Sequence, residues 1–337
     1  MYLIQNIILI FFVNISIMEN SRETEKKHPV VLVTGGSGLV GKAIEKVSLD
    51  YPDYHFVFAS SKDCDLCDLS STQSYFDRIQ PKYVIHLAAC VGGLFKNMNQ
   101  KVDMLEKNLI INYNVIKCSH ASMVQKLIAC LSTCIFPDKT TYPINESMLH
   151  DGPPHHSNDA YAYAKRMLEI QCKAYRENYG SDFQCVIPTN IYGPHDNFHL
   201  EDAHVVPALI HKCYLAKQNG SPFQMRGTGK PLRQFIYSED LAKLIIWTLE
   251  KNKHPTIILS VPEKDEVSIE QVTRLIAREY DYEDHLEFDT SFADGQFKKT
   301  ADNSLLMSET SFEFTPIEEG IKKSVQWFKD NYEIARK

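Results

Sequence analysis

Short runs of apolar, mostly β-branched residues recur along the first half of the chain, and stretches with helical periodicity separate them. Residues 30–33 read Val-Val-Leu-Val, and the apolar positions of residues 39–47 have the spacing of a helix. Further buried strands are predicted at residues 55–59, 83–88, 127–131 and 185–187. This alternation is typical of a parallel sheet covered by helices, so we expect an α/β fold with a doubly wound Rossmann sheet.

Two longer segments, residues 101–124 and 159–179, also show helical periodicity. Each has enough apolar surface to cover a face of the sheet and to meet a second copy of the chain. The second segment ends at Gly180, a residue type that often terminates helices because it adopts left-handed backbone angles.

Glycine and proline become frequent after Pro188, and the elements between them become shorter. This change predicts a smaller substrate-binding lobe beyond the nucleotide-binding domain. We expect that domain to span residues 29–188, with residues 235–262 returning to it. The lobe then takes residues 189–234 and 263–332.

The first 18 residues are strongly apolar and therefore a candidate signal peptide or short anchor. They have no basic n-region and no clear small-residue cleavage site, and Asn6 and Asn14 interrupt a stretch too short to span a bilayer comfortably. We expect residues 1–28 to be a leader outside the fold, and we expect no stable membrane association.

Composition narrows the class of protein. The chain has 337 residues, of which 44% are hydrophobic and 23% charged, enough for one large core or two smaller ones. Its net charge of -7 and scattered basic residues argue against nucleic-acid binding. Nine cysteines without framework spacing predict reduced thiols in the cytoplasm. Cys64 and Cys67 form a CxxC, but no second pair completes a zinc site, so no metal is expected.

A glycine-rich turn joins the first predicted strand to the first predicted helix. Residues 34–41 read Thr-Gly-Gly-Ser-Gly-Leu-Val-Gly. Such a turn lets backbone amides and the helix N-terminus meet a pyrophosphate, which favours dinucleotide binding over a turn that only reverses the chain.

The end of the second predicted strand bears on the choice of dinucleotide. A site for NAD usually carries an acidic residue here, whereas this chain reads Ala-Ser-Ser-Lys over residues 59–62. Hydroxyls and the Lys62 cation suit a 2′-phosphate, so NADPH is favoured over NADH, although Asp63 follows directly. Asp65 and Leu66 either flank the adenine or form an ordinary loop.

Tyr161 and Lys165 are four residues apart in a predicted helix, so their side chains share one face. We expect the ammonium to lower the pKa of the phenol, which then exchanges a proton with a carbonyl or alcohol oxygen. Ser132 lies where a predicted strand ends, at the sheet edge where ligands bind, and is the expected hydrogen-bond partner of that oxygen.

These features occur together with several longer motifs. In chain order the motifs read GGSGLVG, HLAACVGG, LSTCIFP, YAYAK, PTNIYGPHDNF, RQFIYSEDLA and DGQFKKTADN. The sequence resembles the extended short-chain dehydrogenase/reductase family, and within it the GDP-L-fucose synthases, over nearly everything from residue 29 to the C-terminus.

The resemblance implies a two-part reaction. GDP-4-keto-6-deoxy-D-mannose is epimerised at C3 and C5 and then reduced at C4 by NADPH. By the pattern of the family, Cys134 matches the base of the epimerisation and His204 the acid. Without the resemblance, Cys134 would be interpreted as a buried thiol with no catalytic role. His195 and His199 lie in the same loop as His204, so spacing alone does not distinguish the three histidines.

The resemblance also implies a set of ligand contacts and a homodimer formed through the two long helices. Cofactor contacts are expected at Gly35, Gly36, Ser37, Gly38, Leu39, Val40, Gly41, Ser61, Lys62, Asp65, Leu66, Leu87, Ala88, Ala89, Lys165, Pro188, Thr189, Asn190, Ile191 and His204. Substrate contacts are expected at Lys212, Arg226, Arg233 and Asp294. Arg226 departs from the family, in which Trp is frequent, so a cationic contact replaces stacking there.

Two other functions share part of this pattern. An NAD-dependent nucleotide-sugar 4-epimerase or dehydratase would keep the glycine turn and the Tyr161 and Lys165 pair, with other residues at Thr133 and Cys134. A non-catalytic dinucleotide-binding subunit would need the glycine turn alone.

Overall fold

The structure is a computed structural model that describes residues 28–337, except residues 293 and 295. Residues 1–27 lie outside the described residues, and with them nearly all of the predicted leader. Within the described part of the chain, no helix combines the length and the apolar character needed to cross a membrane.

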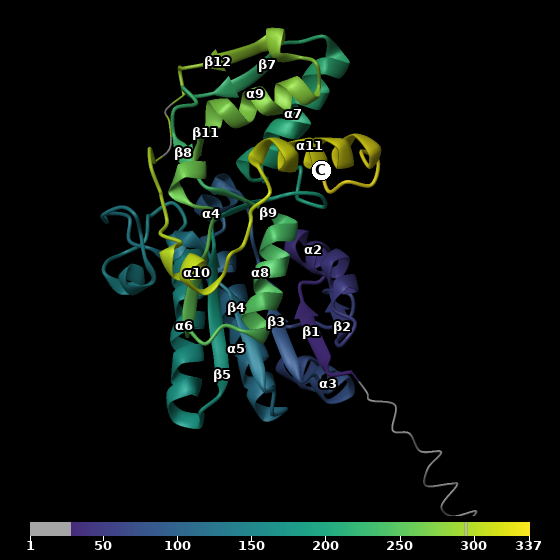
Figure 1. Ribbon diagram of the computed structural model, residues 1–337, viewed down its shortest axis with the longest axis vertical. Helices are drawn as coiled ribbons and strands as arrows, with labels where there is room; N and C mark the ends of the chain where they lie inside the picture. The colour runs from purple at the N-terminus through teal and green to yellow at the C-terminus, as the bar shows by residue number, and fades with distance from the viewer. Residues whose placement is uncertain (1–27, 293, 295) are drawn as a thin grey trace, which may run out of the picture.

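A six-stranded parallel sheet forms the larger part of the molecule (Figure 1). Across the sheet the strands follow the order β10-β5-β4-β3-β1-β2. Their bounds are β1 Val30–Thr34, β2 His55–Ala59, β3 Tyr83–His86, β4 Lys126–Cys130, β5 Asp182–Pro188 and β10 Thr256–Leu259. The strand order reverses beside β1, because the chain continues to β2 on one side and to β3 on the other. The predicted doubly wound Rossmann sheet is confirmed.

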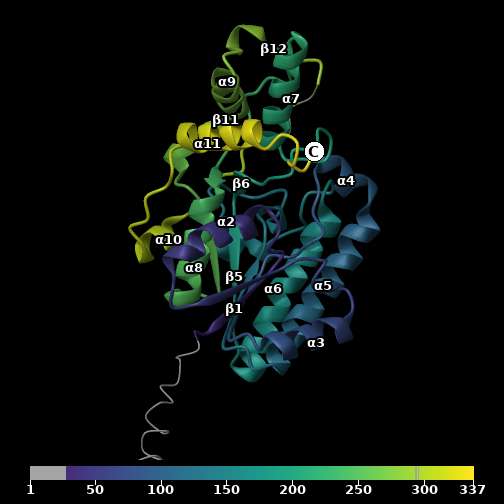
Figure 2. The same ribbon diagram turned by 90° about the vertical axis from the view of Figure 1, so that its right-hand side faces the viewer.

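Helices cover both faces of this sheet, as the two perpendicular views show (Figures 1 and 2). The helices associated with the sheet are α2 Leu39–Val47, α3 Leu69–Ile79, α4 Leu94–Asn99, α5 Lys101–Ala121, α6 Asp159–Tyr179, α8 Ser238–Glu250 and α10 Ser304–Glu309. Helices α5 and α6 pack against each other on one face, and α2 packs against α8 on the other.

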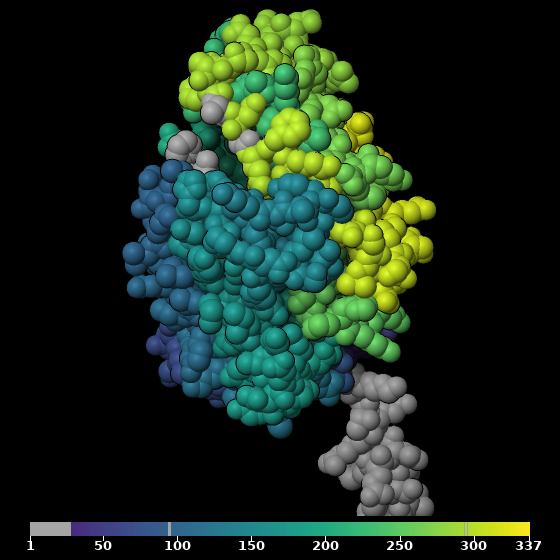
Figure 3. Space-filling view, turned by 90° about the vertical axis from the view of Figure 1, so that its left-hand side faces the viewer, coloured from purple at the N-terminus to yellow at the C-terminus, as the bar shows by residue number. Residues whose placement is uncertain are grey.

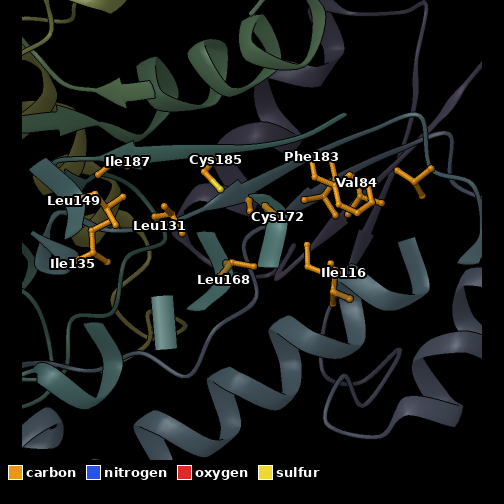
Figure 4. Close-up of a cluster of buried hydrophobic side chains, with 14 of the residues drawn as sticks. Val84, Ile116, Leu131, Ile135, Leu149, Leu168, Cys172, Phe183, Cys185 and Ile187 are labelled. Carbon is orange, nitrogen blue, oxygen red and sulfur yellow. The ribbon is translucent and has the colours of Figure 1, made fainter. Parts of the chain in front are cut away.

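Each face has its own apolar core. Figure 4 shows the core under α5 and α6, where Ile116 and Leu168 meet strand residues such as Val84 and Phe183. Under α2 and α8 the core contains Ile44 and residues of the opposite face of the strands. Alternate residues of a strand point to opposite faces, so a strand buried on both sides is apolar throughout, which explains the short apolar runs in the sequence.

The predicted elements agree with the structure to within a few residues. Helix α6 has the predicted bounds, and Gly180 follows it with a φ of 66°. Helix α5 stops at Ala121 rather than at residue 124, since Met123 has a left-handed φ of 53° that a helix cannot continue through. Strand β3 ends at His86 rather than at residue 88 because the Ala88 amide leaves the ladder and donates to the Thr34 hydroxyl.

The remaining elements form a second lobe beyond the carboxyl ends of the sheet strands, at the top of Figures 1 and 3. They are β6 Asn190–Tyr192, α7 Val205–Asn219, β7 Phe223–Arg226, β8 Leu232–Arg233, β9 Phe235–Tyr237, β11 Val267–Ser268, α9 Ile269–Glu279, β12 Leu286–Asp289 and α11 Ile317–Asp330. A separate apolar cluster, with Phe223 and Phe328 at 0% exposure, fills the lobe.

Candidate active site

The glycine turn after β1 lies at the point where the strand order reverses, the usual ligand crevice of such sheets. Gly35 has a φ of +74°, and a Cβ on it would lie 2.8 Å from the Ala88 nitrogen. A Cβ on Gly41 would lie 2.6 Å from Gly36. Glycine is therefore required for the chain to turn this tightly between strand and helix.

Helix α2 begins directly after this turn. Gly38 is its N-cap residue, its first turn contains no acidic residue, and no side chain caps it within the described structure. The amides of the first turn keep their hydrogen-bonding capacity and the positive end of the helix dipole faces the crevice, an arrangement suited to a phosphate.

The loop after β2 contains the residues expected to select the cofactor. Asp63 accepts hydrogen bonds from the Ser60 amide at 2.8 Å and from the Ser60 hydroxyl at 2.6 Å. These bonds lower the pKa of the Asp63 carboxyl. Its carboxylate is thus engaged within its own turn, whereas Ser61 and Lys62 are exposed.

Residues farther along the cofactor crevice have mostly backbone partners. Asp65 accepts a hydrogen bond from the Cys67 amide, and the Leu66 carbonyl accepts one from the Asn114 side chain. Residues 87–89 follow β3, whereas residues 188–191 connect β5 to β6. All of these segments lie at the carboxyl ends of sheet strands.

Ser132 lies two residues after β4, at the same edge of the sheet. Its hydroxyl accepts a hydrogen bond of 3.4 Å from the Cys134 amide and so caps a 3-10 turn over Thr133–Ile135. Arg166 of helix α6 donates to the Ile135 carbonyl at 2.6 Å. The turn after β4 is therefore fastened to the helix that carries Tyr161 and Lys165.

Tyr161 and Lys165 lie one turn apart on α6, with the Lys165 Nζ 5.9 Å from the centre of the Tyr161 ring. Lys165 is 2% exposed and donates to the Cys130 carbonyl at 2.7 Å. Burial raises the pKa of Tyr161 well above 10.0, and the thiols of Cys134, Cys130 and Cys90 raise it further. The predicted lowering of this pKa is wrong, because burial removes water from the phenol and raises its pKa instead. Tyr161 is a neutral phenol, which is a proton donor.

The Cys134 thiol is buried beside these groups. Burial raises its pKa, whereas the Lys299 charge and a hydrogen bond with Ser132 oppose the increase. Burial also lowers the pKa of Lys299. Lys299 is absent from the predicted site, although it belongs to the DGQFKK segment from which Asp294 was chosen. The sequence signal for Lys299 was the pair of lysines, Lys298 and Lys299, in that segment.

His204 is the exposed N-cap residue of α7, in the second lobe. The loop before it is joined to the segment after β3 by a hydrogen bond of 2.9 Å from the Gly93 amide to the Asp202 carbonyl. In the described part of the chain no hydrogen bond links His204 to Cys134 or to Tyr161. The structure thus groups Ser132, Cys134, Tyr161 and Lys165, and places His204 on a different element.

Three of the four predicted substrate contacts are cations of the second lobe. Burial lowers the pKa of Lys212, and the positive charge of Arg226 lowers it further. The Arg226 guanidinium lies 4.6 Å from the centre of the Phe292 ring. Arg233 donates to the Leu232 carbonyl, and burial lowers its pKa.

Asp294 has a different environment. Its two carboxylate oxygens accept hydrogen bonds from the Thr228 amide at 2.8 Å and from the Thr228 hydroxyl at 2.6 Å. Asp294 therefore holds the loop between β7 and β8, close to Arg226.

Known proteins are similar to this chain over most of its length. Residues 31–259 match the model of the NAD dependent epimerase/dehydratase family. GDP-L-fucose synthase of Dictyostelium discoideum is 58% identical, over 94% of this chain and 99% of that protein. Probable GDP-L-fucose synthase of Drosophila melanogaster is 48% identical, over 91% of this chain and 99% of that protein.

A solved structure gives the same result. The crystal structure of a GDP-L-fucose synthetase from Naegleria fowleri bound to NADP has a TM-score of 0.89 and 50% identity, and the match covers 93% of this chain and 96% of that one. The chain therefore belongs to the NAD dependent epimerase/dehydratase family and, within it, to the GDP-L-fucose synthases.

Proposed function

We propose that this chain epimerises GDP-4-keto-6-deoxy-D-mannose at C3 and C5 and then reduces it at C4 with NADPH to give GDP-L-fucose. The observation that carries the proposal is the grouping of Ser132, Cys134, Tyr161 and Lys165 at the end of β4, at the same edge of the sheet as the glycine turn after β1. A keto sugar bound there can contact the Ser132 hydroxyl, the Cys134 thiol and the Tyr161 phenol at the same time.

The residues of the crevice fit a phosphorylated dinucleotide. The close approaches at Gly35 and Gly41 leave backbone, not side chains, to face the pyrophosphate. Ser61 and Lys62 supply donors for a 2′-phosphate, and Asp63 is turned back onto Ser60 rather than towards an incoming anion. These features favour NADPH over NADH.

In the reduction, bound NADPH supplies the hydride. Tyr161 donates its phenolic proton to the C4 oxygen, and the Ser132 hydroxyl donates a hydrogen bond to the same oxygen as negative charge develops on it. The Lys165 ammonium then stabilises the phenolate that Tyr161 becomes. Because its pKa is raised, the Tyr161 phenol keeps its proton until negative charge develops on the C4 oxygen.

In the epimerisation, the deprotonated Cys134 takes a proton from the carbon beside the C4 carbonyl. The negative charge moves to the C4 oxygen, where Ser132 and Tyr161 stabilise it. His204 donates a proton to the opposite face of the carbon. The Cys134 thiol then releases its proton to solvent and His204 takes one up, which restores both groups. Lys299 favours the thiolate that this step needs.

The cations of the second lobe suit a nucleoside diphosphate. The net charge of the chain is -7, so the diphosphate has to be bound by local groups. Lys212, Arg226 and Arg233 supply these, and Asp294 keeps the β7–β8 loop in place beside them.

We further propose the domain division given by the sequence, with residues 29–188 and 235–262 binding the cofactor and residues 189–234 and 263–332 binding the sugar nucleotide. The arrangement of sheet and lobe supports this division except at two elements, because β9 packs in the apolar cluster of the lobe and α10 packs against β10 of the sheet. All nine cysteines are free in the structure, which fits a reducing compartment such as the cytoplasm.

We also propose a homodimer formed through α5 and α6. These neighbouring helices expose large apolar side chains, with Tyr113 and Met167 each at 48% exposure and Ile170 at 41%. A second copy would remove this surface from water. Met167→Glu is expected to give a monomer in sedimentation equilibrium, whereas a dimer that persists would count against this interface.

One assay separates the proposed reaction from its alternatives. The purified chain is incubated in heavy water with GDP-4-keto-6-deoxy-D-mannose and NADPH. We expect one NADPH to be oxidised per GDP-L-fucose formed, with deuterium at C3 and C5. Conversion without net NADPH oxidation would favour a 4-epimerase or dehydratase, and no turnover would favour a non-catalytic subunit.

A further inference from the structure

His86 is the last residue of β3, is fully buried, and has a hydrogen-bond partner on helix α5. Both of its ring nitrogens have side-chain partners. Nδ1 is 2.8 Å from the Thr34 hydroxyl at the end of β1, and Nε2 is 3.1 Å from the Asn112 side-chain oxygen on α5. None of these three residues belongs to the predicted site.

The directions of these hydrogen bonds follow from the neighbouring groups. The Asn112 amide nitrogen donates to the Ala164 carbonyl at 3.4 Å, so its Oδ1 is the acceptor and His86 Nε2 carries the hydrogen. Nδ1 of His86 then accepts from the Thr34 hydroxyl, which in turn accepts from the Ala88 amide at 3.3 Å. The result is one continuous set of hydrogen bonds from Ala88 to Ala164.

Both hydrogen bonds of His86 require the neutral form of its imidazole ring. Burial lowers the pKa of His86 to about 3, and the positive charge of Lys165 acts in the same direction. The imidazole is therefore neutral throughout the neutral and mildly acidic range, with one nitrogen as donor and the other as acceptor.

The two ends of the hydrogen-bond set meet the two halves of the active site. At one end, Thr34 precedes Gly35, and Ala88 is the residue that a Cβ on Gly35 would strike. At the other end, Ala164 precedes Lys165 on helix α6. A shift of any member would thus alter the separation between the glycine turn and α6.

We propose that His86 is a positioning residue, which through Thr34 and Asn112 sets the separation between the glycine turn and the helix that carries Tyr161 and Lys165. The inference rests on the proposed function, because the separation matters only if hydride transfer takes place between these elements. A displacement of about 1 Å in such a geometry can lower a rate about 100-fold.

The test uses two near-isosteric variants, Thr34→Val and Asn112→Leu, which break the set on either side of His86. Thr248→Val is the matched control: Thr248 is also fully buried, and its hydroxyl donates to the Leu244 carbonyl at 2.8 Å within α8, away from the site. Rates are compared at a temperature at which circular dichroism shows all three variants folded.

We expect Thr34→Val and Asn112→Leu to lower kcat by about 10- to 100-fold, with the KM for NADPH changed by less than about threefold. The kinetic isotope effect with [4-²H]NADPH should increase, because hydride transfer becomes slower than product release. Thr248→Val should change neither quantity even if its melting temperature falls. Equal kcat losses in all three variants, or a loss confined to KM, would overturn the positioning role.

A second measurement is independent of turnover. In ¹⁵N-histidine NMR spectra, with the His86 signals assigned by their loss in His86→Gln, the ring should be neutral with hydrogen on Nε2 from pH 5 to 8. Protonation in this range, or hydrogen on Nδ1, would refute the hydrogen-bond set. A wild-type chain without turnover would refute the proposed function, whereas normal turnover by both variants would refute the positioning role alone.

Discussion

The Lys165 ammonium donates a hydrogen bond of 2.7 Å to the backbone carbonyl of Cys130. This bond joins the second turn of α6 to the last residue of β4, two positions before Ser132. Lys165 therefore holds two catalytic elements together in addition to supplying a positive charge near Tyr161.

Replacing Lys165 with methionine should remove both contributions. We expect Lys165→Met to lower kcat for the reduction by at least about 100-fold, because the phenolate of Tyr161 loses its stabilising charge. NADPH affinity should also fall, since Lys165 is a predicted cofactor contact. Steady-state kinetics and NADPH fluorescence titration measure the two effects. Lys173→Met, an exposed position of the same helix, serves as the control, and equal activity in both variants would contradict the assignment.

Cys134→Ser should separate the two parts of the reaction. Because a hydroxyl is a far weaker acid than a thiol, we expect deuterium incorporation at C3 and C5 from heavy water to be lost, while NADPH binding stays within about twofold. Cys67→Ser, at an exposed cysteine, should leave incorporation intact. Normal incorporation by Cys134→Ser would remove this thiol from the mechanism.

Lys299 should determine how readily Cys134 loses its proton. Its charge lowers a thiol pKa that burial raises, so Lys299→Met is expected to move the pH dependence of deuterium incorporation to higher pH and to slow incorporation about 10-fold at neutral pH. Lys298→Met is the matched control, because Lys298 is adjacent to Lys299 in the sequence but forms an ion pair with Glu263. An unchanged pH profile in Lys299→Met would show that the two groups are not coupled.

Asp196 makes the stability of the fold depend on pH. It is 5% exposed, its Oδ2 has no hydrogen-bond partner in the described structure, and burial raises its pKa from 3.8 to about 7. Between these two values the folded protein retains a proton that the unfolded chain has released. The free energy of unfolding therefore falls as pH rises through this window, by at most about 1.4 kcal/mol per pH unit.

Asp196→Asn should remove this dependence, because an amide does not ionise. Its Oδ1 can still accept the hydrogen bond from the Asn197 amide. We expect the variant to gain stability over the wild type from pH 5 to 8, by about 2 kcal/mol across the range. Denaturant unfolding at both pH values measures the gain. The exposed Glu177→Gln should show none, and parallel pH profiles for wild type and Asp196→Asn would disprove the assignment.

The sheet was predictable because its inner strands are buried on both sides and therefore apolar without interruption, as at residues 31–33. The glycine turn and the Tyr161 and Lys165 pair were predictable because their spacing is local and their conformation is fixed by the turn and the helix. Pairings between residues of distant segments were not predictable from the sequence. The effect of the Lys299 charge on Cys134 joins residues 165 positions apart, and no local pattern encodes it.

The direction of the Tyr161 pKa shift also depends on long-range packing. The sequence shows an ammonium one turn away but does not show how completely the surrounding segments exclude water from the phenol. Similarly, His86 is an ordinary strand residue in the sequence, and its partners Thr34 and Asn112 come from another strand and from a helix.

The central claim is that the Tyr161 phenol donates the proton that completes reduction at C4. Single-turnover NADPH oxidation by Tyr161→Phe, with the keto sugar nucleotide in excess and cofactor binding verified by fluorescence, tests this directly. We expect the rate to fall by about 100- to 10,000-fold while NADPH still binds. NADPH oxidation at the wild-type rate by Tyr161→Phe would contradict the mechanism.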